Sequence, residues 1–486
     1  MLQSSDTFPA PAPLPVPPFP LHVVRTLRDA GHEAFFVGGC VRDLLLGRVP
    51  KDYDVVTSAR PDAIEGLFPH SLPIGKAFGI ITVVPDTEAF PGAVPVEVAT
   101  FRAESTYADG RHPDPGTLRF TDAREDALRR DFTINALLLA PFPPDGAPPS
   151  VCDFTGGRAD LDSRTIRAIG DPVRRFTEDR LRMLRAIRFA STLGFSIDPA
   201  TFDAIRALAP GIHDISAERI RDELLRILTE SADAGAALDL LDTSGLLREI
   251  LPEISAMHGV EQPPEFHPEG DVYVHTRLML SALPPHPSQR LALAVLLHDV
   301  GKPPTANLAT LPDGTRRWRF ESHATVGAEM ARAMLARLRI PNALADDVVW
   351  MVGNHMRLAD APRMRPPKLR RLLAAPTLED ELELHRLDCI CSHGDRSILG
   401  FLDEARARFA AEPVLPPPLV MGRDLIAAGL APGPSFKPIL RALYDLQLEG
   451  ETDKAVLLSR IPGIVNKHTK NEALSARGFD LEQKAD

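Results

Sequence analysis

The sequence contains little cysteine and no long hydrophobic segment. Its four cysteines, Cys40, Cys152, Cys389 and Cys391, form no Cys-x-x-Cys pair, so neither a zinc ribbon nor a disulfide framework is indicated. No apolar run is long enough to span a bilayer, and the proline-rich N-terminus lacks the basic start of a signal peptide. We therefore expect a cytoplasmic protein with no membrane partner.

Positive charge is not in excess either. The 486 residues carry a formal net charge of −11, with 25% charged and 44% hydrophobic residues. This composition is ordinary for a soluble globular protein and argues against a surface coated in positive charge. It does not exclude RNA binding, because a local basic surface can bind phosphates while the rest stays acidic. The length predicts three or four domains or subdomains.

The character of the chain changes near residue 170. Short β-rich runs alternate with helical stretches before it, whereas strand signals vanish after Asp171 and helical spacing dominates. The predicted fold is an α+β head, a small mixed sheet with helices, followed by an all-α remainder. Proline-rich joints near Pro263 and Pro413 help to place the boundaries. The predicted units are a disordered Pro-rich leader (1–20), the head (21–166), a helical neck and body (167–262), a further domain (263–400) and a helical tail (401–486).

A glycine turn follows the first predicted strand, Glu33–Val37. Gly38 and Gly39 lead into a predicted helix over Cys40–Leu46. Two glycines let the backbone approach a ligand closely, and free N–H groups at a helix start suit a triphosphate. Arg42, one turn inside this helix, can add a charge-assisted contact. Such a turn alone is more often structural, so its interpretation depends on the residues that follow.

Two aspartates come next, around the start of the second predicted strand. Side chains alternate along a strand, so Asp52 and Asp54 project from one face and Tyr53 from the other. Two close carboxylates repel unless a cation lies between them, and Mg²⁺ prefers such ligands together with substrate phosphates. Two ions of this kind can activate an attacking hydroxyl and stabilise a leaving pyrophosphate. Glu97, on a later β-rich run, is either a third catalytic acid or an exposed strand glutamate.

With several further motifs, the chain resembles the class II nucleotidyltransferase family, which holds CCA-adding enzymes and bacterial poly(A) polymerases. The motifs occur in the family order, and their combination is highly specific. They are Gly38-Gly39 with Arg42-Asp43, Asp52-x-Asp54, Arg129-Arg130-Asp131-Phe132-Thr133-Ile134-Asn135-Ala136, Asp153-Phe154-x-Gly156-Gly157, Glu178-Asp179-x-x-Arg182 and Glu218-Arg219-x-x-x-Glu223.

This resemblance implies roles for individual residues. It implies a head whose Asp52 and Asp54 bind metal, and a neck whose Asp179 and Arg182 read the incoming base. Asp131 would support the ribose region. The other residues implied to contact the nucleotide are Gly38, Gly39, Arg42, Arg130, Arg185 and Arg188.

A predicted helix over Thr177–Thr192 is consistent with these roles. Its first residue is a suitable N-cap, and Asp179 and Arg182 are three apart and therefore neighbours on a helix surface. Their carboxylate acceptors and paired guanidinium donors can mimic the edge of a base. Arg182 and Arg185 stay clear of the apolar stripe, whereas Arg188 falls near its edge. The alternative is a charged, solvent-exposed face laced with ion pairs.

A second cluster of metal-binding residue types lies in the unit 263–400. The adjacent pair His298-Asp299 with a distant His and Asp resembles the HD superfamily of metal-dependent phosphohydrolases, so this unit is expected to be an HD domain. The expected ligands are His275, His298, Asp299 and Asp388. Imidazole and carboxylate fit Mn²⁺, Ni²⁺ or Fe²⁺, and such a site can activate water against a phosphoester. His323 and His355 are either a second metal position or ordinary helix histidines, and many HD-like domains of this family serve as scaffold.

The leading hypothesis is template-independent addition of CMP and AMP to the tRNA 3′ end from CTP and ATP. The RNA 3′-hydroxyl would attack the α-phosphate while Asp52 and Asp54 hold Mg²⁺. A poly(A) polymerase, or an enzyme that adds only CC or only A, shares nearly every motif, and the segment between Glu97 and Asp126 is expected to influence that choice. A phosphohydrolase acting on RNA ends or nucleotides is a hypothesis of a different class. No protein partner is predicted.

Overall fold

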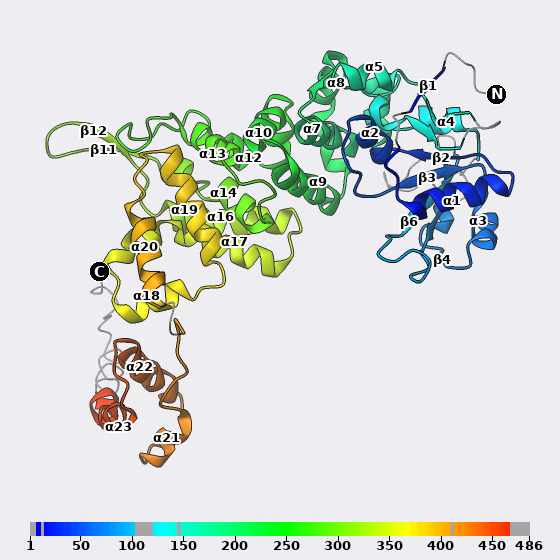
Figure 1. The fold of residues 1–486 in the computed structure, drawn as a ribbon. Helices are drawn as coiled ribbons and strands as arrows, with labels where there is room; N and C mark the ends of the chain where they lie inside the picture. Colours follow the sequence, from blue (N-terminus) through cyan, green and yellow to red (C-terminus); the bar gives the residue numbers. More distant parts are fainter. Residues whose placement is uncertain (1–5, 11–13, 103–119, 143–146, 410–412, 467–486) are drawn as a thin grey trace.

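The computed structural model describes residues 6–10, 14–102, 120–142, 147–409 and 413–466. These parts form an elongated molecule, with the N-terminal sheet at one end and the last helices at the other (Figure 1). Within the described ranges, no helix is long and apolar enough to cross a membrane. The predicted fold class, a mixed-sheet head followed by mainly helical domains, is confirmed.

The head is built on one mixed sheet of eight short strands. They are β1 (Thr7–Pro9), β2 (Ala34–Val37), β3 (Asp54–Thr57), β4 (Ser71–Leu72), β5 (Ile80–Val83), β6 (Val96–Thr100), β7 (Leu138–Ala140) and β8 (Ser150–Cys152). Their order is β1-β8-β7-β2-β3-β6-β5-β4, and β3 and β6 are the parallel pair. The first two predicted strands correspond to β2 and β3, and the predicted β-rich run that carries Glu97 corresponds to β6.

Part of the predicted disordered leader belongs to this sheet. Thr7–Pro9 pairs antiparallel with β8 at the sheet edge, where a proline is tolerated because only one side of the strand is hydrogen-bonded. The helix α1 (Pro18–Asp29) then begins with proline in its first turn. The prediction of disorder is therefore wrong for these residues. Composition alone did not reveal β8, a partner strand that arrives much later in the chain.

The two faces of the sheet differ because side chains alternate along each strand. Val55 and Val98 join the main core on the face that carries α1, α2 (Gly39–Leu45) and α3 (Pro61–Leu67). Val56 belongs to a smaller apolar cluster on the opposite face. Asp54 and Glu97 alternate with Val55 and Val98, so their carboxylates lie on this second face. The remaining head helices are α4 (Ala123–Leu128) and α5 (Gly157–Asp162), with one-turn 3₁₀ segments η2 (Lys76–Phe78) and η3 (Thr133–Asn135).

Helices make up most of the remaining chain. The neck and body contain α6 (Pro172–Glu178), α7 (Leu181–Leu193), α8 (Pro199–Leu208), η5 (Ala209–Asp214), α9 (Ala217–Glu230), α10 (Ala234–Thr243), α11 (Leu246–Ile250) and α12 (Pro252–Ser255). The HD region contains α13 (Val272–Ser281), α14 (Gln289–Leu297), α15 (Lys302–Thr305), α16 (His323–Arg337), α17 (Asn342–Asn354), η6 (His355–Arg363), α18 (Pro366–Leu373), α19 (Leu378–Cys391) and α20 (Ser397–Arg408). The tail contains α21 (Gly422–Ala427), α22 (Phe436–Leu448) and α23 (Lys454–Ser459).

Two pairs of strands interrupt these helices. The parallel pair β9 (Thr165–Ile166) and β10 (Ser196–Ile197) joins the head to the neck. The antiparallel hairpin β11 (Asn307–Thr310) and β12 (Arg316–Arg319) projects from the HD region (Figure 1). The expectation that strand structure ends after Asp171 is wrong for β10 and for the β11–β12 hairpin, because strands of two to four residues are too short to show a periodicity.

A continuous apolar core joins the head, the neck and the HD helices, whereas the tail has its own cluster from Val420 to Ile461. A third cluster includes Leu358, Leu373 and Leu402 and therefore packs α20 onto the HD region. The predicted boundary at residue 400 cuts through α20 and is wrong. The predicted boundary at residue 20 cuts through α1 and is wrong for the same reason. The remaining boundaries stay predictions.

Candidate active site

The glycine turn and the aspartates meet at one end of β2 and β3. Val37 pairs with Asp54, so the turn that follows β2 lies beside the start of β3. Gly38 has φ +79°, a conformation that residues with a Cβ rarely adopt. A Cβ built on Gly38 would lie 3.7 Å from Asp54 Oδ2 and 3.9 Å from Arg130 Nη1, and one on Gly39 would lie 3.6 Å from Arg42 Nη2. The turn thus brings the backbone close to both a carboxylate and two guanidinium groups.

Asp52, Asp54 and Glu97 form an acidic cluster on one face of the sheet. Asp54 is in register with Glu97 across the β3–β6 pair. Partial burial, together with the nearby charges of Asp52 and Glu97, raises the pKa of Asp54 to about 6, although Arg130 opposes the shift. Tyr53 points to the other side, where its ring packs 5.7 Å from that of Phe36. An oxygen-only site with mutually repelling charges fits a hard divalent cation, because the cation removes the repulsion.

Two arginines beside this cluster are held by buried partners. Arg42 donates through Nη1 to Asn135 Oδ1 at 2.9 Å and forms an ion pair with Asp43 at 2.7 Å. Arg130 pairs with Asp126 at 3.1 Å. Asp126 is fully buried. Burial alone would raise the pKa of its carboxyl group, but the positive charges of Arg130 and Arg129 have the larger effect and lower that pKa. The sequence reasoning gave no role to Asn135 and Asp126, although Asn135 lies inside a motif that was recognised.

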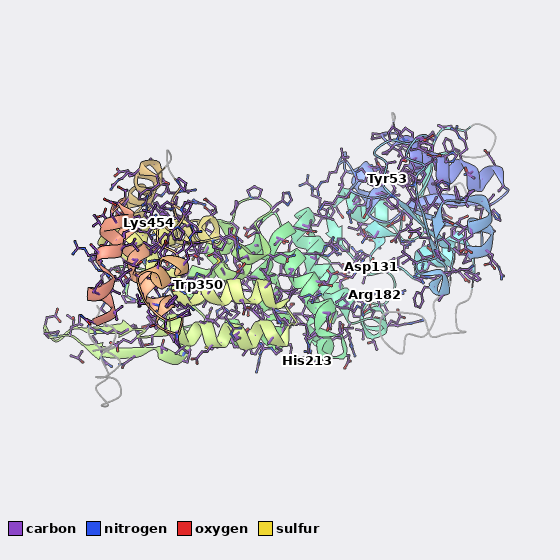
Figure 2. All side chains as sticks on the ribbon, turned by 90° about the horizontal axis from the view of Figure 1, so that it is seen from below. Tyr53, Asp131, Arg182, His213, Trp350 and Lys454 are labelled. Atoms are coloured by element: carbon purple, nitrogen blue, oxygen red, sulfur yellow. The ribbon has the colours of Figure 1, made fainter. Side chains whose placement is uncertain are left out.

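Asp131 joins the head to the neck. Its Oδ2 accepts hydrogen bonds from Arg185 Nε at 2.8 Å and Nη2 at 2.6 Å, and its Oδ1 accepts one from the Phe132 N–H at 2.8 Å. Burial opposes the charge of Asp131, but Arg185 outweighs it and lowers the pKa. Asp131 and Arg182 lie where the head meets the helices of the neck (Figure 2). The first half of α7 therefore faces the head site.

The predicted single helix over Thr177–Thr192 is wrong, because two helices, α6 and α7, break at Asp179. The Asp179 carboxylate accepts the Leu181 N–H at 3.0 Å and so starts α7. Short polar side chains compete in this way for backbone hydrogen bonds. Thr177 is not an N-cap: it lies in the last turn of α6 and donates to the Val173 carbonyl. The cap of α6 is Asp171.

The two predicted base-reading residues each have another partner. Arg182 pairs with Glu178 at 3.0 Å and donates to the Arg175 carbonyl at 2.9 Å. Asp179 pairs with Arg219 at 3.2 Å. To bind a base, Arg182 and Asp179 would have to break these ion pairs and form hydrogen bonds to the base instead. Their role in base selection stays a prediction.

Arg188 is buried rather than open to a ligand. Its side chain is 5% exposed and pairs with Glu223, 8% exposed, at 2.6 Å between α7 and α9. Its guanidinium also lies 4.1 Å from the centre of the Phe189 ring, which Arg42 and Arg185 approach at 5.4 and 5.3 Å. Arg188 thus stabilises the neck, and its contact with a nucleotide stays a prediction.

The histidines and aspartates of the HD region converge, although they come from five helical segments. Two adjacent groups have metal-ligand geometry: His275, His298 and Asp388, and then Asp299, His323 and His355. Asp299 connects the groups, since its Oδ2 lies 3.1 Å from His298 Nε2 and its Oδ1 lies 3.7 and 3.9 Å from the Nε2 atoms of His323 and His355. The structure therefore places His323 and His355 beside the four predicted ligands.

The ring nitrogens of this cluster are oriented for ligand binding. The Nδ1 atoms of His298, His323 and His355 donate to backbone carbonyls at 2.8–2.9 Å, which leaves each Nε2 facing the cluster. The buried Nε2 atoms of His275 and His298 lie 3.2 Å from Asp388 Oδ1 and 3.1 Å from Asp299 Oδ2, but without hydrogen-bond geometry. Buried imidazole nitrogens that converge with carboxylates in this way fit a bound transition-metal ion.

The pKa values in this cluster depend strongly on its charges. Burial lowers the pKa of His355 to about 4, which keeps its imidazole neutral and able to bind a metal. Burial also disfavours the charge of His275, but the carboxylates of Asp388 and Glu269 outweigh it and raise its pKa to about 9. Glu269 accepts the His275 Nδ1–H at 2.6 Å. The sequence reasoning assigned Glu269 no role, because it lies in an irregular segment without periodicity.

Three family descriptions match successive parts of the chain. Residues 34–167 match the poly A polymerase head domain, residues 194–257 the probable RNA and SrmB-binding site of polymerase A, and residues 270–396 the HD domain. The CCA-adding enzyme of Geobacillus stearothermophilus is 31% identical over 442 residues, covering 90% of this chain and 94% of that protein. The CCA-adding enzyme of Levilactobacillus brevis is 45% identical over 221 residues, which span 46% of this chain and 52% of that protein.

Solved structures of similar proteins share the whole arrangement. The crystal structure of the Bacillus stearothermophilus CCA-adding enzyme in complex with CTP has a TM-score of 0.67 and 27% identity, covering 93% of this chain and 98% of that one. The Thermotoga maritima CCA-adding enzyme complexed with tRNA has a TM-score of 0.55 and 18% identity, covering 93% and 96%. At that identity the second likeness supports the fold alone.

Proposed function

Because this chain belongs to the family of CCA-adding enzymes, we propose that it adds C, C and A to the 3′ end of tRNA from CTP and ATP, without a nucleic-acid template. The observation that carries this proposal is the acidic cluster of Asp52, Asp54 and Glu97 beside the Gly38-Gly39 turn. A head that only delivered RNA would not need three neighbouring carboxylates that repel one another.

Enzymes of this family depend on a divalent metal ion, and we propose Mg²⁺ held by Asp52 and Asp54. When bound, the metal supplies positive charge that favours attack by the RNA 3′-hydroxyl and steadies the leaving pyrophosphate. The glycine turn leaves room for a triphosphate, and Arg42 and Arg130 supply fixed positive charge beside it. Because Asn135 and Asp126 hold these two side chains in place, little reorganisation is needed on binding.

Base selection is assigned to Asp179 and Arg182. Together they present carboxylate acceptors and guanidinium donors at the start of α7, next to Asp131 and Arg185. When no base is bound, the ion pairs with Arg219 and Glu178 hold these two side chains in a fixed position. Substitution of either residue should therefore alter the choice between CTP and ATP more than the rate of bond formation.

Two substitutions on either side of Tyr53 test the metal assignment. Asp52→Ala and Asp54→Ala are expected to abolish addition to tRNA. Tyr53→Phe is the matched control, because it removes only a hydroxyl that contacts the Pro15 carbonyl on the other side of the sheet. Addition that survives in both alanine variants would contradict the assignment.

We also propose a second activity, metal-dependent hydrolysis of a phosphoester in the HD region. The supporting observation is the group of Asp299, His323 and His355, which lines a cavity of about 590 Å³ together with Lys302 and two arginines. Water would be consumed, and the products would be an alcohol and phosphate. Asp299→Asn is expected to abolish hydrolysis with Mn²⁺ or Ni²⁺ and to leave addition to tRNA intact; loss of addition instead would assign Asp299 to the scaffold.

A further inference from the structure

The cavity of the HD region extends beyond the metal-binding residues. Its lining includes the buried Asp299 and also the aromatic side chains Phe266, Trp318 and Phe320. Its volume of about 590 Å³ is within the range of pockets that enclose small ligands. A phosphate group bound at Asp299 and the histidines would fill only part of it. The remaining space has aromatic and cationic walls, which the hydrolysis of a simple phosphoester does not require.

Phe266 and Arg317 form one of these walls. The Arg317 guanidinium lies 4.7 Å from the centre of the Phe266 ring, within the range of a cation–π contact. Phe266 is 46% exposed although it is a large apolar side chain in a cavity. Among the described residues, no carboxylate lies within ion-pair distance of Arg317. An exposed ring next to a planar cation is the combination on which proteins stack single nucleobases.

The hairpin that carries Arg317 is attached to the segment that carries Phe266. Arg317 lies on β12, which pairs with β11 through the whole hairpin. The neighbouring Trp318 donates from its indole Nε1 to Glu261 at 3.1 Å. Phe266 is placed by a turn in which its N–H donates to the Pro263 carbonyl at 3.0 Å. The contact between hairpin and turn therefore holds the two side chains at a defined separation.

We propose that Phe266 and Arg317 form a nucleobase platform for the HD site. The ligand is a nucleoside phosphoester, with its base on the platform and its phosphate toward Asp299, His323 and His355. This inference rests on the proposed hydrolase function and adds the residues that would bind the base of its substrate. The same chemistry occurs in a free nucleoside monophosphate and in the last nucleotide of a single-stranded RNA.

Tryptophan fluorescence can test the platform without any turnover. The chain has two tryptophans, Trp318 in the cavity wall and Trp350 outside it, so Trp350→Phe leaves Trp318 as the only reporter. We expect adenosine 3′-monophosphate to change the fluorescence of Trp318. Arg317→Ala and Phe266→Ala should each weaken this binding by about tenfold, from the loss of one stacking partner. In the same two variants, the affinity for glycerol phosphate, which has a phosphate but no base, should change by less than about twofold.

Arg316→Ala is the matched control, because Arg316 is an exposed arginine of the same strand that does not line the cavity. The platform would be overturned if Arg316→Ala weakened the binding of adenosine 3′-monophosphate as much as Arg317→Ala does. It would also be overturned if Arg317→Ala weakened the binding of glycerol phosphate and of adenosine 3′-monophosphate equally. A short single-stranded RNA that binds more tightly than the mononucleotide, through the same two residues, would identify the RNA end as the source. If nucleotide binds through Arg317 and Phe266 but wild-type protein hydrolyses no phosphoester, the hydrolase proposal fails and the platform stands.

Discussion

Replacing Asp54 by asparagine is expected to stabilise the metal-free head while it abolishes nucleotide addition. Without a cation, partial burial and the repulsion from Asp52 and Glu97 raise the pKa of the Asp54 carboxyl group to about 6 from the ordinary value of 3.8. That difference corresponds to about 3 kcal/mol of destabilisation above pH 6, as an order of magnitude. Asparagine has nearly the same shape and no charge, so it should recover part of this free energy.

The sign of the effect depends on pH. Because the folded-state pKa is raised, the charged form is disfavoured in the folded head, so the destabilisation develops as the pH rises from about 4 and is complete above about pH 6. It disappears as the pH falls below the ordinary value near 4 and the carboxylate becomes protonated in both states. The stability gain of Asp54→Asn should therefore be largest at pH 8 and absent at pH 4. Mg²⁺ should stabilise the wild type at pH 8 but not the variant.

Hydrogen exchange in peptides that cover β2 and β3, measured in EDTA, reports the stability of this part of the head. Asp43→Asn serves as the control, because Asp43 forms a favourable ion pair with Arg42 and its removal should lower stability. The reasoning is refuted if Asp54→Asn is less stable than the wild type at pH 8, or if the gain is the same at pH 4.

Three further predictions concern the neck and the HD region. Arg188→Ala should lower the free energy of unfolding of the neck by about 3–5 kcal/mol, because it leaves Glu223 buried and unpaired. The double variant Arg188→Met, Glu223→Leu should recover most of this loss in urea unfolding. A double variant as unstable as Arg188→Ala would contradict this explanation. Arg175 donates hydrogen bonds to the Leu128, Arg129 and Ile169 carbonyls and so helps to position the neck against the head. Arg175→Lys removes these bonds and should lower kcat/KM for CTP and ATP alike in steady-state kinetics. An effect on only one of the two nucleotides would argue against this positioning role. His355→Asn should weaken Mn²⁺ binding, measured by calorimetry, and leave CCA addition unchanged. If the affinity for Mn²⁺ does not change, His355 is not a ligand of the metal site.

The sequence predicted those parts of the site that depend on local periodicity. The alternation around Tyr53 separated its buried ring from Asp52 and Asp54, and the structure confirms this separation. The same alternation left Glu97 open as a third acid, and its register with Asp54 brings the two together. The family resemblance and the fold class are likewise confirmed.

Features that depend on distant partners could not be predicted in this way. The strand Thr7–Pro9 needs β8, and the break between α6 and α7 needs the competition of the Asp179 carboxylate for a backbone N–H. Asp126 and Glu269 act through residues that fold against them, so neither showed a pattern in the sequence. The segment expected to influence the nucleotide product lies largely outside the described residues.

Extension of three tRNA transcripts tests the central claim most directly. The transcripts end before CCA, after the first C and after CC, and each is supplied with CTP, ATP or both. We predict that all three are completed to CCA when both nucleotides are present, and that Asp54→Ala extends none. Growth of only the last transcript with ATP, growth of only the first two with CTP, or long A tails on any RNA would contradict full CCA addition.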